Sequence, residues 1–181
     1  YTFITLDEVL TKGWGSRALV VALESPASRP MGESMQPDLS NLPADTMVQI
    51  AVTEDDMSVG VCPGAFHQQM FNALPNERNQ LIEVHSDLYG FPRLVASHYV
   101  QTNPAYDRLA DWGFYRRIDA QADFLVAHGR NDTFTADWAF QYMTEEETLT
   151  NMGKWSDGTP VLPLSVYSDG INTEARFSAC T

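Results

Sequence analysis

Two acidic residues and a histidine have the types and spacing needed for a catalytic carboxylate–imidazole pair. Asp55 and Asp56 follow the apolar run Met47–Thr53, and His98 lies beyond a later run, Gln80–His85. A carboxylate that accepts a hydrogen bond from one imidazole nitrogen leaves the other nitrogen free to take a proton. We select Asp56 rather than Asp55 as the partner of His98. The simpler interpretation is that both acids only solvate a turn.

The other histidines are weaker candidates for chemistry. His67 lies one residue beyond the apolar stripe of a predicted helix, which indicates a structural role. His85 ends a predicted strand and is either a core residue or a rim residue. His128 belongs to a His-Gly-Arg turn and is expected to face solvent. His98 follows a segment with an early glycine and proline and a late apolar run, and it remains the preferred catalytic base.

The elements that must position these residues can be predicted from the pattern of apolar residues. Three nearly continuous apolar runs have strand length: Arg17–Leu23, Met47–Thr53 and Gln80–His85. Such runs are typical of strands covered on both faces, as in parallel sheets. Between the last two runs, Phe66, Met70 and Leu74 recur every four residues, which predicts a helix over Pro63–Leu74 with one apolar stripe. Strand, helix and strand with short joints imply a parallel crossover.

The rest of the chain is expected to add helices and loops to this sheet. Helices are predicted at Thr5–Lys12, Ala105–Ala127 and Thr135–Glu146, and a long loop at Glu24–Pro43. Ala105–Ala127 is either one helix bent at Gly113 or two helices. Val161–Tyr167 is either an added edge strand or an extended tail, because Pro163 bars it from the centre of a sheet. The predicted fold is therefore α/β, a mostly parallel sheet with flanking helices and an added helical and extended tail.

Composition limits the classes of partner. The 181 residues suit a single domain over 1–181 or the C-terminal portion of a larger one. A net charge of −13, from 24 acidic and 11 basic residues, argues against nucleic acid and anionic membranes as partners. No run approaches the roughly 20 apolar residues of a membrane span. The sequence has no metal-ligand spacing of Cys and His, and we predict neither a metal nor a cofactor.

The two cysteines leave two alternatives open. A disulfide between Cys62 and Cys180 would tie the last residues of the chain to the start of a predicted helix. Two unrelated free thiols are equally compatible with the sequence.

The order of elements and two sequence stretches resemble a known family. Ser86–His98 and Met152–Val161 are similar to segments of α/β-hydrolases of the secreted esterase and lipase kind. Together with the order of strands, the resemblance covers Arg17–Tyr106 and corresponds to the C-terminal half of that fold. It implies that Asp56 is the acid and His98 the base of a Ser-Asp-His triad, with the serine upstream of both.

The sequence departs from this family where the nucleophile belongs. The motif Gly-x-Ser-x-Gly is absent, and its nearest match, Gly32–Gln36, lacks the last glycine and places Ser34 before a proline. Three explanations remain: the chain is the C-terminal part of a larger hydrolase, an inactive relative that serves as a binding or assembly subunit, or an unrelated α/β fold.

The first explanation implies a partner and a substrate. The strand Arg17–Leu23 would lie at a sheet edge that must be covered by a companion polypeptide or a second copy. The substrate would be a small ester, and the protein would be secreted or extracytoplasmic. The loop Glu24–Pro43 and Trp155 are candidates for the pocket wall, although for Trp155 we prefer the simpler interpretation of an ordinary core or rim aromatic.

Overall fold

The computed structural model describes residues 2–14, 17–27, 38–102 and 106–180. Its strands are β1 (Leu19–Glu24), β2 (Thr46–Thr53), β3 (Asn79–Val84) and β4 (Ser165–Tyr167). Its α-helices are α1 (Thr2–Thr11), α2 (Cys62–Met70), α3 (Arg108–Ala110), α4 (Arg116–Arg130), α5 (Thr133–Thr144), α6 (Glu146–Leu149) and α7 (Gly170–Thr173). Single helical turns at Leu39–Asn41, Asn76–Arg78, Val100–Thr102 and Ala175–Phe177 and a π-helical segment at Asp111–Tyr115 complete the regular structure.

The four strands form one mostly parallel sheet in the order β1-β2-β3-β4. β1 pairs in parallel with β2, and β2 in parallel with β3, as the continuous apolar runs predict. β4 is antiparallel to β3 and only three residues long, so the segment after Pro163 is an edge strand rather than an extended tail. Within the described residues, β1 is the other edge and pairs with β2 alone.

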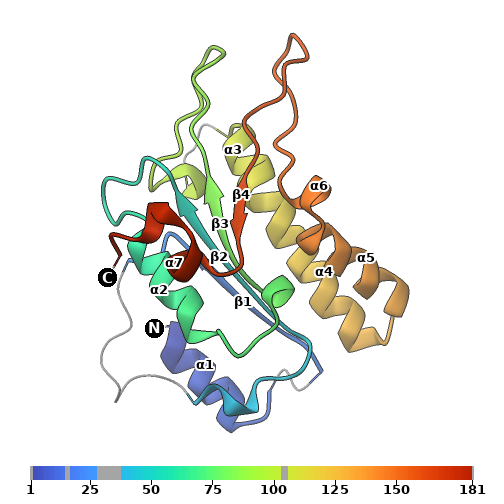
Figure 1. Cartoon of the computed structure of the whole chain (residues 1–181). Coiled ribbons are helices and arrows are strands. Elements are labelled where there is room, and N and C mark those ends of the chain that lie inside the picture. The colour runs from blue at the N-terminus through green and yellow to red at the C-terminus, as the bar shows by residue number, and fades with distance from the viewer. Residues whose placement is uncertain (1, 15–16, 28–37, 103–105, 181) are drawn as a thin grey trace.

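Helices cover both faces of the sheet (Figure 1). Helices α1, α2 and α7 lie on one face, and the antiparallel pair α4 and α5 lies on the other. Alternate side chains of β2 contact the two layers: Val48, Ile50 and Val52 pack with the first, and Met47 packs with the second. All eight residues of β2 are buried, so the architecture has three layers with β2 in the middle layer.

The predicted stripe of α2 packs against the core on this face of the sheet, but its closest approach to β2 is made by smaller residues. Phe66 and Met70 are only half-buried, and Leu74 lies beyond the end of the helix, whereas Gly64 and Ala65 are fully buried. A Cβ atom at Gly64 would lie 2.4 Å from Cγ1 of Val52. The glycine therefore lets the helix approach β2 more closely than the large side chains of the predicted stripe would allow.

The helical region after residue 105 is interrupted at the predicted glycine. Gly113 lies within the π-helical segment that joins α3 to α4. Its Cα faces Val84 of β3, whose methyl groups would be 3.5 Å from an added Cβ. The first turn of α4 is attached to the sheet by Arg117, which is 1% exposed and donates to both carboxylate oxygens of Glu24 at 2.8 Å. This ion pair links α4 to the carboxyl end of β1.

The two cysteines form a disulfide that joins α2 to the end of the described chain. Cys62 and Cys180 are 118 residues apart in the sequence. The bond closes a loop that contains β3, the α4–α5 pair and β4. It therefore restrains the unfolded chain over almost two thirds of its length.

We expect Gly64→Ala to destabilise the fold by about 1–3 kcal/mol, because the new methyl group overlaps Val52 at the interface of α2 and β2. Gly129→Ala is the matched control: Gly129 is exposed in α4, and an added Cβ meets nothing within 4 Å. That variant should be neutral or more stable by up to about 1 kcal/mol. Urea unfolding measures both; equal effects of the two substitutions would contradict the close approach of α2.

Replacing both Cys62 and Cys180 by serine should lower the free energy of unfolding by about 2–5 kcal/mol, because a long loop is released in the unfolded state. Thermal unfolding by circular dichroism, compared with the wild type before and after reduction, measures the effect. The double variant should be insensitive to reductant. Unchanged stability of the oxidised and reduced wild type would argue against the bond.

Candidate functional site

Asp56 and His98 lie together at the carboxyl ends of the parallel strands. Nδ1 of His98 is 2.7 Å from Oδ2 of Asp56. The side chain of Asp56 is 1% exposed, and that of His98 is 22% exposed. Because an ionised carboxylate can only accept, Nδ1 of His98 carries the hydrogen, and in the neutral ring Nε2 is the nitrogen with the lone pair. Within the described residues no hydrogen bond occupies Nε2.

Asp56 is held by its own turn. The turn starts directly after β2, where the amide of Asp56 donates to the carbonyl of Thr53 at 3.2 Å. Oδ1 of Asp56 accepts the amides of Ser58 and Val59, both at 2.8 Å. One oxygen is thus used by the turn, which leaves Oδ2 for His98.

These hydrogen bonds set the pKa of Asp56. Burial of the carboxyl group opposes its ionisation, but the hydrogen bonds from His98, Val59 and Ser58 and the attraction of the imidazole outweigh it. The pKa of Asp56 is therefore lowered from its ordinary value, and the group is ionised at neutral pH.

Asp55, the acid that we did not select, positions the histidine segment instead. Its amide donates to the carbonyl of Ala96 at 3.0 Å, and its Oδ2 accepts the hydroxyl of Ser86 at 2.5 Å. The oxygen of Ser86 in turn accepts the amide of Ala96 at 2.8 Å. These contacts attach the chain two residues before His98 to the turn that carries Asp56. The adjacent acids thus have different functions, one in contact with the ring and one in contact with the backbone that carries it.

Two long loops extend beyond this end of the sheet (Figure 1). They comprise residues 86–96 after β3 and 151–164 before β4. Asp87 joins them: its Oδ2 accepts Nε1 of Trp155 and the amide of Leu162, both at 3.0 Å. The Trp155 ring also covers Gly90, where a Cβ would lie 2.3 Å from the ring. Trp155 is therefore a half-buried aromatic that fastens the two loops together, as the simpler interpretation predicted.

The remaining histidines have other surroundings. His67 is buried in α2 and contacts the carbonyl of Pro63 at 2.6 Å, and burial lowers its pKa, consistent with a structural role. The expectation for His128 is wrong: it belongs to the last turn of α4, is half-buried, and packs on Phe124 with ring centroids 4.4 Å apart. The helix continues through Gly129, so no turn releases the ring to solvent. His85 is a rim residue in contact with Ser165.

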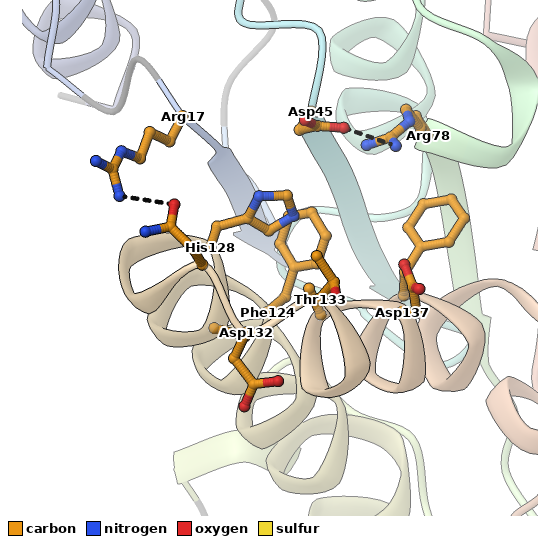
Figure 2. A pocket seen from close by; sticks show the side chains of 12 residues that line it. Arg17, Asp45, Arg78, Phe124, His128, Asp132, Thr133 and Asp137 are labelled. Atoms are coloured by element: carbon orange, nitrogen blue, oxygen red, sulfur yellow. Dashed lines mark hydrogen bonds and ion pairs between the residues drawn. The ribbon is translucent and has the colours of Figure 1, made fainter.

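A cavity of about 450 Å³ lies at the opposite end of the sheet (Figure 2). Asp45 and Arg78, on its wall, immediately precede β2 and β3, whereas Asp56 follows β2. Phe124 and Phe140 supply its apolar surface. Two of its charged side chains, Arg78 and Asp45, pair with each other at 3.1 Å. The cavity shares no residue with the Asp56–His98 pair.

Two predicted features cannot be placed. Ser34 and the middle of the loop Glu24–Pro43, residues 28–37, lie outside the described residues. Within the described chain no serine or threonine hydroxyl is bonded to His98, so the pair has a base and an acid but no attached nucleophile.

Comparisons with protein-family models, with curated proteins and with solved structures find no match to this chain. Across the described ranges, no group of three or more His, Cys, Asp or Glu side chains is arranged to hold a metal ion. None of the helices described is both long and apolar enough to cross a membrane.

Asp56→Asn should lower the free energy of unfolding at neutral pH, and this loss should shrink in acid. The pKa of Asp56 is lowered by folding, so its ionised form stabilises the protein above about pH 4–5, and that contribution is lost as the pH falls through the native pKa. Urea unfolding of both proteins at a series of pH values from 7 to 3 measures the difference. A difference that is constant, or that grows in acid, would contradict a lowered pKa.

Proposed function

We propose that this chain supplies the acid and the base of a serine-type carboxylic ester hydrolase. The observation that carries the proposal is the 2.7 Å contact between a buried, ionised carboxylate and an imidazole whose second nitrogen has no hydrogen-bond partner among the described residues. In this arrangement His98 takes the proton of an attacking hydroxyl through Nε2 and later gives it to the leaving alcohol. Asp56 holds the tautomer and stabilises the imidazolium that forms.

The proposal requires a serine from outside the described residues, and the edge of the sheet favours a companion chain as its source. β1 pairs only with β2 among the described residues, and Ala22 in its centre is exposed. Bare edges of parallel sheets are normally covered. A strand added in parallel to β1 would end at the same side of the sheet as Asp56 and His98. A serine after that strand would therefore lie next to the pair, as the α/β-hydrolase resemblance implies.

The compartment is proposed from the disulfide. A bond between Cys62 and Cys180 is typical of proteins that fold in oxidising surroundings, so we place the protein outside the cytoplasm. The net charge of −13 keeps such a protein dispersed in solution.

In the natural protein with its companion polypeptide, Asp56→Asn should lower kcat/KM for p-nitrophenyl esters by about 10⁴-fold. An asparagine amide donates toward Nδ1 of His98, so the imidazole carries its hydrogen on Nε2 and cannot act as a base. His98→Ala should cost about 10⁶-fold. His128→Ala is the matched control, because His128 is half-buried at the other end of the sheet, and its activity should equal that of the wild type.

Labelling by a fluorophosphonate identifies the missing nucleophile. In the purified natural material, mass spectrometry should find a label on a serine outside residues 2–14, 17–27, 38–102 and 106–180. The labelling should require His98. If neither ester hydrolysis nor any such label is found, the chain is a binding or assembly subunit that lacks the reaction.

A further inference from the structure

A second carboxylate and imidazole lie near Asp56 and His98, and this second pair has a hydroxyl attached. Nε2 of His85 is 2.7 Å from Oγ of Ser165. Nδ1 of the same ring is 3.4 Å from Oε2 of Glu54. Hydroxyl, imidazole and carboxylate thus follow one another in the order that activates a serine for nucleophilic attack.

Three strands place these groups on one side of the sheet. Glu54 directly follows β2, and its amide donates to the carbonyl of Val84, the last residue of β3, at 3.0 Å. His85 is the next residue along the chain. Ser165 begins β4 and pairs with Glu83. Because alternate residues of a strand face the same side, Glu83, His85 and the cross-strand neighbour Ser165 share one face.

The neighbouring charged groups form one network with the pair, because Arg176 contacts both Glu83 and Oε1 of Glu54. Glu83 is fully buried; its Oε2 accepts the hydroxyl of Tyr167 at 3.0 Å, and its Oε1 pairs with Arg176. Burial raises the pKa of Glu83, although Arg176 and Tyr167 oppose the shift. The carboxylate whose oxygen lies 3.4 Å from Nδ1 of His85 is Glu54; the same oxygen, Oε2, accepts the amide of Ser86 at 3.0 Å, while its Oε1 lies 3.8 Å from Arg176.

The hydroxyl and the base can be reached from solvent. The side chain of His85 is 18% exposed, and Ser165 is half-buried on an edge strand. The Asp56–His98 pair has a more buried acid and a shorter contact, but no hydroxyl among the described residues. The two pairs are thus built from the same two segments, after β2 and after β3, and differ in what faces Nε2.

We infer that Ser165 is a nucleophile, with His85 as its general base and Glu54 as the group that orients the ring, and that this centre acts on acyl esters independently of Asp56 and His98. Oγ of Ser165 forms a bond to the acyl carbon while its proton passes to Nε2 of His85. The carbon–oxygen bond to the alcohol breaks, and the alcohol leaves with that proton. Water, deprotonated in the same way, then releases the acid and restores Ser165.

The expected turnover is slow, because the pairing of Ser165 and His85 does not by itself stabilise the negative charge on the acyl oxygen. Each oxyanion-hole donor contributes about 10²–10³-fold to such a reaction. A reactive phosphonyl fluoride is therefore a better probe than ester turnover. In that reaction Oγ bonds to phosphorus, fluoride leaves, and the proton is released through His85.

The test uses the isolated chain, an alkyl fluorophosphonate and mass spectrometry of the digested product. We expect one phosphonyl group, on Ser165, and at least a roughly 100-fold slower reaction in His85→Gln, because general-base assistance is lost. Ser178 is the matched control serine: it is exposed, its hydroxyl donates to the carbonyl of Ala175, and it has no imidazole neighbour. Ser178→Ala should leave the labelling unchanged, and Ser165→Ala should abolish it.

His98→Ala separates this centre from the proposed ester hydrolase. Labelling of Ser165 should keep its rate in that variant, whereas hydrolysis through the Asp56–His98 pair is lost. Absence of a label on Ser165 in the wild-type chain, or an equal rate in the wild type and His85→Gln, would overturn the inference and would leave the proposed function untouched.

Discussion

All eight residues of β2 are buried, and each side chain faces one of two helical layers. Val48, Ile50 and Val52 contact the α2 side, and burial of each large aliphatic side chain contributes about 1.5–3 kcal/mol. Gly64 is required because α2 lies directly on Val52. The opposite face of β2 is closed by α4 and α5. Gln121 of α4 donates a buried hydrogen bond of 2.7 Å to Gln49 of β2. The position of the acidic turn after β2 follows from this packing.

That turn orients three carboxylates in three different ways. Glu54 faces His85, Asp55 holds the backbone before His98, and Asp56 accepts the His98 ring. The strands β2 and β3 end side by side, so residues that directly follow them are brought within hydrogen-bond distance. A parallel pair of strands thereby produces two carboxylate–imidazole contacts at one edge. The two contacts differ in how deeply the carboxylate is buried and in which group faces Nε2 of the histidine. These differences distinguish the two proposals.

Much of the fold could be predicted from the sequence, because apolar runs report burial directly. The predicted strand Met47–Thr53 differs from β2 by one residue. Gly113 was expected to bend or divide a helix, and it lies in the π-helical segment between α3 and α4. The close approach of α2 to β2 at Gly64 was not predictable, since a glycine has no apolar side chain to signal a close contact. The array at Ser165 was missed as well. Its serine lies 80 residues from His85, on a three-residue edge strand with no periodic signal.

The sequence by itself determined the parallel strands and the crossover helix, because these depend on residue types within short windows, and it identified Asp56 and His98 as candidate partners. Their catalytic role stays a prediction. Only the tertiary structure decided that Nδ1 of His98 meets Asp56 across 42 residues and that Cys62 is bonded to Cys180 across 118. Such contacts depend on how separate segments pack on β2, and local composition carries no information about that packing.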